Sequence, residues 1–460
     1  MKQTLLTFLM ITCVVIIGQA QTSFAAKQTI NATTGDAPYN IASGFVDGDA
    51  YADIVIGTWF GNTIEWYKNN GDGTFTQQTD ISTATNGVGG IKLVDLNNDT
   101  YLDVLATSYN DGELVWFKND GSGNFSAKNV IATGLTGSGG LATGTIDAGT
   151  TIDVAVVAYG LNKVVWFANN GDETFNATEN IIDNSLTEQG SINLKDIDGD
   201  GDLDALIATA EWANGVIEIF RHNGDDPVTY TKDPTSVDTG KTYMFFAAFE
   251  DVDGDTNLDI LAVDLYGDAS WYEDNGAGFT ETVFTTSISN PSVMQYRDLD
   301  DDGNKDIILS SGASGVGNDL VWFRNLGGGT FGAETVIDAT QSQAYVFTIN
   351  DFDNDLDLDI ASCAYNEDHL NWFENEKYTL STTTNELNEI TIYPNPAKDR
   401  IYFKNTKLET INLKVYNVLG KEIMQKSINT NESLNISNLS NGMYIITIAE
   451  FNATYKFIKR

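Results

Sequence analysis

The stretch Asp196-Ile-Asp-Gly-Asp-Gly-Asp-Leu-Asp204 decides how the rest of the chain is interpreted. Acidic side chains stand at positions 1, 3, 5 and 9 of this nine-residue loop, and Asp202 adds one at position 7. Carboxylates held this close together repel one another unless a cation lies between them. An EF-hand would require Glu at position 12, whereas Ile207 stands there within an apolar, strand-like run. We therefore predict a calcium-type loop set between two β-strands.

The same loop recurs along the chain. Seven copies, separated by 47 to 55 residues, begin at Phe45, Asp95, Thr145, Asp196, Asp251, Asp298 and Asp351. A second landmark, an apolar–aromatic pair, follows each loop at Trp66, Trp116, Trp166, Ile219, Trp271, Trp322 and Trp372. A period of this length with short apolar segments is typical of a four-stranded propeller blade. The predicted fold is all-β: a seven-bladed β-propeller with calcium-binding loops, followed by a small C-terminal β-sandwich.

Each blade is predicted to contain four strands in the same order. In the second repeat, one strand ends at Val94 before the loop, and the next covers residues 102–106 after it. The third strand carries the Trp-aromatic pair, and a Gly-rich turn leads to a fourth strand. That strand is predicted to begin at an aromatic residue, which is Phe75, Phe125, Phe175, Tyr230, Phe279 or Phe331. We interpret the recurrent Trp as a wedge between blades.

The seventh repeat lacks its fourth strand, because the pattern stops after Asn375. Phe24 stands 21 residues before Phe45, a separation that matches the complete repeats. We therefore expect residues 22–31 to supply the outer strand of the last blade. This arrangement would close the ring and remove a free sheet edge.

Composition restricts the possible partners and the compartment. The formal charge of −40 argues against nucleic acid or anionic membranes as partners. Residues 1–20 have the pattern of a secretory signal cleaved near Ala20, and no segment is long enough for a membrane span. Removal of the signal leaves Cys363 as the only cysteine, so no intrachain disulfide can form. Metal ions are the expected source of additional stability.

The loops and their spacing resemble the FG-GAP/VCBS repeat family, whose calcium-loop propellers also occur in integrin α-subunits and some fungal lectins. The resemblance covers residues 21–376 and implies about five calcium ions on one face of the propeller. Calcium prefers six or seven oxygen ligands, which four side chains, a backbone carbonyl and a water would supply. The implied ligands are Asp95, Asn97, Asp99 and Asp103; Asp196, Asp198, Asp200 and Asp204; Asp251, Asp253, Asp255 and Asp259; Asp298, Asp300, Asp302 and Asp306; and Asp351, Asp353, Asp355 and Asp359.

Two loops depart from this pattern. In the first loop Phe45 replaces the first acid, and whether the remaining Asp47, Asp49 and Asp53 bind calcium is left open. The third loop has Thr145 and Gly149 at ligand positions, so we expect no ion there. The alternative for all these acids is a series of solvated Asx-turns, which five near-complete copies disfavour.

The C-terminal part has a different composition. Residues 377–388 are polar and Thr-rich, as in a linker, and residues 389–460 carry 10 Lys+Arg against 6 Asp+Glu. Residues 389–460 alternate apolar and polar positions and resemble the C-terminal sorting domain of the type IX secretion system. The matching motifs are Tyr393-Pro-Asn-Pro396, residues 415–421, residues 439–444 and residues 456–460. The resemblance implies a partner, the type IX machinery, and a secreted or cell-surface location.

Catalytic motifs are not recognisable in the sequence. His222 and His369 lie far apart, and neither a Gly-x-Ser-x-Gly elbow nor a phosphate-binding loop occurs. We therefore predict a protein without enzymatic activity. A carboxylate pair outside the loops that acts on a glycosidic bond is the alternative.

Aromatic residues recur in the turns between the second and third predicted strands. They are Trp59, Tyr109, Tyr159, Trp212, Tyr266 and Tyr365, and the sixth repeat has only Gly and Ser there. Such turns open on the face opposite the loops, where aromatic rings suit stacking on sugars; alternatively they cap the blade ends. The leading hypothesis is a monomeric binding or adhesion module for glycans. A polysaccharide lyase or hydrolase and a scaffold for a surface protein are the alternatives.

Overall fold

The computed structural model describes residues 23–377, except 213, 277, 285 and 314–318, and residues 391–460, except 405–409, 418–420, 430–431 and 449–452. The chain divides into two compact units, Met1–Thr379 and Leu380–Arg460, which are treated separately below. The predicted signal peptide and nearly all of the predicted linker lie outside the described residues. None of the described segments forms a helix with the length and hydropathy needed to cross a bilayer.

The first unit contains seven antiparallel sheets, and each begins with three consecutive strands of one repeat. The strands are β2 (Pro38–Gly44), β3 (Asp53–Thr58), β4 (Ile64–Asn69) and β5 (Phe75–Gln77); β6 (Val88–Val94), β7 (Asp103–Ser108), β8 (Glu113–Phe117) and β9 (Asn129–Ala132); β10 (Ser138–Gly144), β11 (Asp153–Ala158), β12 (Lys163–Phe167) and β13 (Asn180–Asp183), with a 3-10 turn η1 (Tyr159–Leu161); β14 (Gln189–Lys195), β15 (Asp204–Thr209), β16 (Gly215–His222), β17 (Tyr230–Lys232) and β18 (Asp238–Lys241); β19 (Met244–Glu250), β20 (Asp259–Asp264), β21 (Ala269–Asp274) and β22 (Phe279–Val283); β23 (Pro291–Arg297), β24 (Asp306–Ser311), β25 (Leu320–Asn325) and β26 (Phe331–Asp338); and β27 (Val346–Asn350), β28 (Asp359–Ala364), β29 (His369–Phe373) and β1 (Gln28–Asn31).

The second strand of each sheet is buried along its whole length. In β7, for example, Val104, Leu105 and Ala106 are all fully inaccessible to solvent. A strand that is covered on both faces needs no alternation of polar and apolar residues. Continuous apolar runs after each acidic loop therefore specify strands in the middle of sheets that pack between neighbours.

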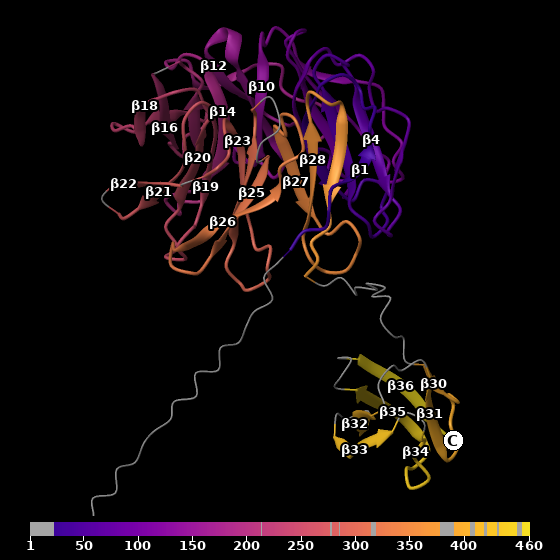
Figure 1. Ribbon diagram of the computed structural model, residues 1–460. Coiled ribbons are helices and arrows are strands. Elements are labelled where there is room, and N and C mark those ends of the chain that lie inside the picture. Colours follow the sequence, from indigo (N-terminus) through magenta and orange to yellow (C-terminus); the bar gives the residue numbers. More distant parts are fainter. Residues whose placement is uncertain are drawn as a thin grey trace, which may run out of the picture. The chain divides into compact units, whose positions relative to one another are not determined.

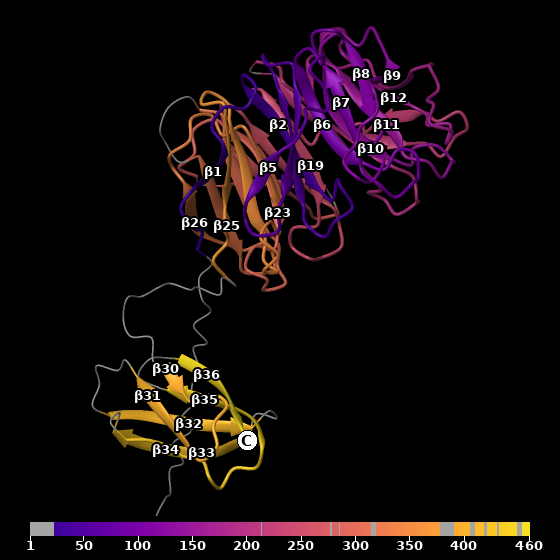
Figure 2. The ribbon, with the colours of Figure 1, turned by 90° about the vertical axis from the view of Figure 1, so that its right-hand side faces the viewer.

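The sheets follow one another in chain order around the first unit. Each first strand contacts the first strand of the next sheet, in the order β2, β6, β10, β14, β19, β23 and β27, and β27 contacts β2 again. Figure 1 shows this progression from the indigo strands near β1 to the orange strands β27 and β28, and Figure 2 shows the same sheets turned by 90°. The arrangement is β-propeller-like, with the first strands lining the centre.

The N-terminal segment completes the last sheet, which confirms the sequence prediction. β1 pairs antiparallel with β29, with Gln28 opposite Trp372, and Phe24 forms a bridge with Asn375. In Figure 1 the indigo β1 lies beside the orange strands of this sheet. The outer edge of β29 is therefore covered by a segment from the other end of the repeat array.

The recurrent Trp rings lie between sheets, as predicted. The ring of Trp66 packs edge-on against Phe125 of the next sheet, with 6.1 Å between ring centroids, and Trp116 packs in the same way against Phe175 at 6.5 Å. A Cβ atom at Gly123 would lie 2.0 Å from the Trp66 ring. Gly123 also has a φ of +75°, so the Gly-rich turn both bends tightly and admits the neighbouring indole.

The fourth strands differ from the sequence prediction in the second and third repeats. Phe125 and Phe175 form only isolated bridges, and the strands β9 and β13 begin several residues later. The fourth repeat adds β18, which pairs with the same strand as β17. In the second and third repeats the Phe residue packs against the Trp of the preceding sheet. Regular strand pairing begins only several residues later, at β9 and β13.

The second unit contains seven strands among its described residues. They are β30 (Thr391–Tyr393), β31 (Arg400–Lys404), β32 (Thr410–Asn417), β33 (Glu422–Asn429), β34 (Leu434–Asn435), β35 (Gly442–Ile448) and β36 (Ala453–Lys459). They form a three-stranded sheet, β30-β31-β34, and a four-stranded sheet, β33-β32-β35-β36. Both sheets contribute to one core that includes Ile401, Val415, Ile446 and Phe457.

Candidate functional site

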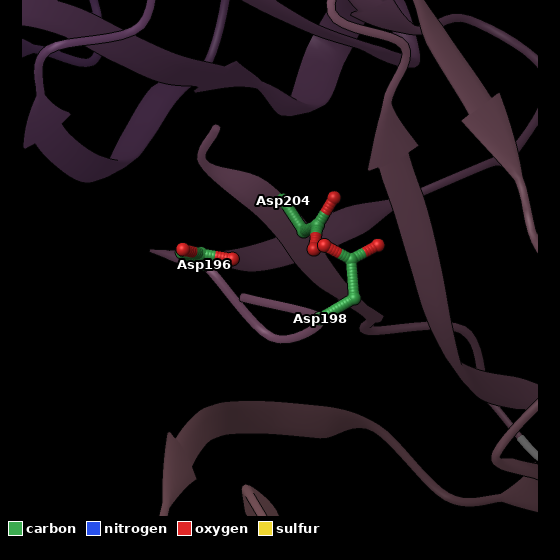
Figure 3. A group of neighbouring side chains, drawn as sticks. All are labelled: Asp196, Asp198 and Asp204. Atoms are coloured by element: carbon green, nitrogen blue, oxygen red, sulfur yellow. The ribbon is translucent and has the colours of Figure 1, made fainter. Parts of the chain in front are cut away.

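Acidic loops connect the first and second strands of the seven sheets, and in four of these loops three aspartates converge. The groups are Asp196, Asp198 and Asp204; Asp251, Asp253 and Asp255; Asp298, Asp300 and Asp302; and Asp351, Asp353 and Asp355. Within each group, ligand oxygen atoms lie within 4.8 Å of one another. Figure 3 shows the three carboxylates of the fourth loop gathered around a common centre. Three oxygen donors at this separation suit a hard divalent cation such as calcium.

The first aspartate of a loop also shapes the backbone. In the second loop, Asp95 accepts hydrogen bonds from the backbone N–H groups of Asp99 (3.1 Å) and Thr100 (2.8 Å). Asp196 accepts from Gly199 and Gly201 in the same way. The second loop therefore folds like the others, although Asn97 supplies an amide oxygen in place of a carboxylate and no triad of acids forms there.

The two atypical loops have different local chemistry. In the first loop the ammonium group of Lys68, on β4, forms ion pairs with Asp47 and Asp49. These contacts raise the pKa of Lys68 well above its usual value. Arg221 and Arg324 occupy the same position in the fourth and sixth loops, and each pairs with two aspartates of its loop, so a cationic side chain from the third strand is not confined to the first loop. In the third loop, Asp147 accepts from the N–H of Gly149 at 2.7 Å.

The ninth-position aspartate has the same backbone partners in all seven loops. In the second sheet, Asp103 accepts from the N–H of Leu96 at 3.1 Å and from the N–H of Asn119 at 2.8 Å. Equivalent pairs of bonds form at Asp53, Asp153, Asp204, Asp259, Asp306 and Asp359. Burial nevertheless raises the pKa of Asp103 to about 6. Among the ninth-position aspartates predicted as ligands, only Asp204 belongs to a triad. In all seven loops the ninth-position aspartate links the loop to the third strand through its two backbone hydrogen bonds.

Sequence reasoning missed a set of five buried residues that we call the bridging asparagines: Asn69, Asn119, Asn169, Asn325 and Asn375. Each stands three residues after the recurrent Trp. The amide of Asn119 donates to the carbonyl of Leu102 in its own loop (3.0 Å) and to that of Val46 in the preceding loop (2.6 Å). The bridging asparagines therefore fasten adjacent sheets at the level of the acidic loops. Their regular spacing after the Trp is visible in the sequence. The carbonyl groups to which they donate across the sheet boundary belong to another repeat, so the sequence does not show those hydrogen bonds.

Asn69 offers a direct test because it joins the first sheet to the last. Its amide donates to the carbonyls of Ala52 (3.0 Å) and Phe352 (2.8 Å). We expect Asn69→Ala to lower the free energy of unfolding by about 3 kcal/mol, because two buried acceptors lose their donor. The matched control is Asn70→Ala at the exposed neighbouring position, where urea unfolding should change by less than about 0.5 kcal/mol. Equal effects of the two substitutions would contradict the bridging role.

Aromatic side chains gather at the opposite end of the second strands. The ring of Trp59 lies 4.9 Å from Tyr109 and 5.3 Å from Tyr39, and Tyr39 also contacts Tyr345 and Tyr365. In a separate pair, the rings of Trp212 and Tyr266 are 5.0 Å apart and both are more than half exposed. We call these seven residues the aromatic rim. Of the six predicted aromatic residues, five therefore belong to two contacting groups.

A cavity of about 620 Å³ lies among the first strands next to the aromatic rim. Tyr39, Trp59 and Tyr109 line it, together with Tyr159, the sixth predicted aromatic. Burial raises the pKa of Tyr159 to about 12, so its hydroxyl is a hydrogen-bond donor at neutral pH. The volume is within the range of small-molecule sites.

Tyr39 and Tyr345 were not predicted, although the repeat spacing contains a signal for them. Both stand six residues before the first position of their loops, where the second, third and fourth repeats have Gly89, Gly139 and Gly190. These three glycines also line the cavity. This position is therefore asymmetric around the ring, with tyrosines in the first and seventh repeats and glycines in the second, third and fourth.

A closed ring of sheets with an acidic loop at the same place in each repeat defines a β-propeller-like repeat protein. The family described as FG-GAP-like repeat matches residues 46–106, 150–207 and 196–262, and the secretion system C-terminal sorting domain matches residues 391–460. The chain thus contains FG-GAP-like repeats and a C-terminal Por secretion sorting domain, which confirms both resemblances. The sorting domain indicates export by the type IX system to the cell surface or the medium.

No curated protein sequence matches the chain. Three solved structures are similar to it: an Agrocybe aegerita lectin that recognises non-reducing terminal N-acetylglucosamine (17% identity, TM-score 0.46, 66% of this chain and 81% of that chain), virginiamycin B lyase from Staphylococcus aureus (14%, 0.49, 77% and 99%), and a chain of the complex of BBS1N with ARL6DN (10%, 0.53, 78% and 98%). At these identities the similarity concerns the fold alone.

Proposed function

We propose that this secreted protein is a calcium-stabilised, seven-bladed β-propeller that binds glycans without cleaving them. The observation that carries the proposal is the aromatic rim, of which Tyr39, Trp59 and Tyr109 line the cavity. The exposed pair of Trp212 and Tyr266 presents two ring faces to solvent, and the rings of Trp59 and Tyr109 continue into the cavity. Aromatic faces bind the C–H faces of sugar rings, while nearby polar groups select hydroxyl patterns.

The acidic loops support a structural role for calcium in this proposal. They lie at the other end of the second strands from the aromatic rim, so ions bound there would not contact a ligand at the rim. The four aspartate triads, together with the Asp95 loop, would hold about five ions. Calcium fits the all-oxygen donor set, and the ions would offset the repulsion between carboxylates and hold the loops against the bridging asparagines.

The test is binding of immobilised glycans by the full chain and by a variant with Trp212→Ala and Tyr266→Ala. We expect the double variant to bind its glycan roughly tenfold more weakly, because each lost aromatic contact contributes about 0.5–1.5 kcal/mol. Leu326→Ala, at another exposed apolar residue, serves as the control and should leave the affinity unchanged. Retention of full affinity in the double variant would contradict the proposal. Release of shortened saccharides during the assay would favour a carbohydrate-cleaving enzyme.

A further inference from the structure

The central cavity differs in charge from the rest of the protein. The chain has 65 Asp+Glu and 25 Lys+Arg, which gives most surfaces a negative potential. Among the described residues that line the cavity, however, none is an aspartate or glutamate, and Lys92 is the single charged residue. Glu188 lies beside Tyr159 but does not line the cavity. An acidic protein thus has a cavity whose one fixed charge is positive.

Lys92 occupies a position that carries no charge in the other repeats. It stands three residues before the first loop position, and the equivalent residues are Ala42, Ala142, Asn193, Ala248, Gln295 and Thr348. The three polar ones have partners on neighbouring first strands. Asn193 accepts from the N–H of Phe249, Gln295 donates to the carbonyl of Phe347, and Thr348 exchanges a hydrogen bond with Ser43.

Lys92 makes no hydrogen bond or ion pair to any described residue in the structure. Lys92 is partly buried, and its removal from solvent lowers the pKa of its ammonium group. A buried charge without a partner is unfavourable, so proteins either pair such a lysine or replace it. Two other polar atoms on the cavity wall, Oγ of Ser191 and Oε1 of Gln189, are also buried and lack hydrogen-bond partners.

We propose that the central cavity binds an anionic sugar unit, carboxylated or sulfated, whose negative group pairs with the ammonium of Lys92. The inference rests on the proposed glycan-binding function and specifies the class of glycan. Tyr39, Trp59 and Tyr109 provide aromatic rings on the cavity wall, and Gly139 leaves room for the sugar. A Cβ at Gly139 would meet no other atom closer than 4.0 Å, so the wall is open at Gly139, whereas Gly89 and Gly190 face neighbouring backbone.

The experiment measures the affinity of the full chain for three tetrasaccharides: a uronic-acid tetrasaccharide, its neutral carboxyl-reduced form, and a sulfated derivative of that neutral form. We expect at least one anionic form to bind about tenfold or more tightly than the neutral form, as a charge-assisted hydrogen bond predicts. Lys92→Met, which keeps the length of the side chain, should abolish this preference. Gly139→Leu, which adds a bulky side chain at the open part of the wall, should weaken binding of the anionic sugar, and Gly139→Ala should largely retain it.

The control for loss of positive charge is Lys128→Met, because Lys128 is an exposed lysine that pairs with Glu113 outside the cavity. This variant should keep the full preference for the anionic sugar. If all three sugars bind equally and Lys92→Met has no effect, the inference is wrong while glycan binding stands. If none of the three binds and glycan arrays are also negative, both the inference and the proposed function are wrong. Preference for the uronate or for the sulfate identifies which group Lys92 binds.

Discussion

Removal of divalent cations with EDTA is expected to lower the melting temperature of the first unit by more than 10 °C. Each site filled at about 100 times its dissociation constant contributes about 2.7 kcal/mol to folding, so four sites contribute about 11 kcal/mol. The four aspartate triads are the physical basis, because each holds its carboxylate oxygens within 4.8 Å of one another. Differential scanning calorimetry with and without EDTA, followed by addition of excess calcium, measures the effect and its reversal.

The effect of EDTA should be larger at pH 8 than at pH 5. In the metal-free protein, burial raises the pKa of Asp359 to about 8, and burial with the nearby Asp355 raises that of Asp353 to about 6. The folded state therefore holds protons that the unfolded chain releases above about pH 4, and its stability falls as the pH rises from about 4 to 8. Calcium requires deprotonated ligands, so the bound form follows the opposite trend.

Two substitutions distinguish bound calcium from a general effect of ionic conditions. Asp253→Ala removes one side-chain ligand of a triad and should reduce the number of calcium ions bound per chain by one, as measured by elemental analysis after dialysis. Asp147→Asn changes the third loop, where no ion is expected, and should leave that number unchanged. A melting curve that does not respond to EDTA at either pH would contradict the structural role of calcium.

The repeat period, the strand order and the closure of the last sheet could be predicted because each has a local or periodic cause. The acidic loop needs aspartates at fixed spacing, the Trp needs a glycine turn opposite it, and the strand between them is buried on both faces. The position of Phe24 was informative because repeat spacing continues across the two ends of the array. The outer strands of the second and third sheets were misplaced because their exposed residues carry little pattern.

The contacts between repeats could not be predicted from the sequence. In the sequence Asn119 has the features of a turn residue, and only the structure shows that its amide donates to the carbonyl of Val46 in the preceding sheet. Lys68 reads as a surface lysine, and its place between Asp47 and Asp49 depends on how β4 lies beside the loop. Lys92 and Tyr39 face the centre only because seven first strands meet there. The alternation of side chains along a first strand does not show which of its two faces lines the cavity. That face is determined by the neighbouring sheets in the folded structure.

Deletion of residues 21–34 is expected to lower the melting temperature by about 10 °C and to promote aggregation. The deletion removes β1, whose Ile30 packs against the core between the first and last sheets. It also removes Phe24, which packs against the core between the sixth and last sheets. The loss of these two side chains and of the strand pairing lowers the free energy of unfolding by about 5 kcal/mol. At about 2 °C per kcal/mol for a unit of this size, the melting temperature falls by about 10 °C. The unpaired edge of β29 would then be available to other chains.

A single substitution tests the backbone pairing of the N-terminal segment without removing its side chains. The N–H of Ala25 donates to the carbonyl of Glu374 at 2.8 Å, next to the bridge between Phe24 and Asn375. Ala25→Pro removes this donor, while Ala25→Ser retains it with a side chain of similar size. We expect the proline variant to melt several degrees lower and the serine variant to melt like the original chain. If the deletion and the proline variant both melt normally, the ring does not depend on β1. The seven sheets would then be held by contacts such as the bridging asparagines, of which Asn69 and Asn375 bind the first and last sheets to their neighbours.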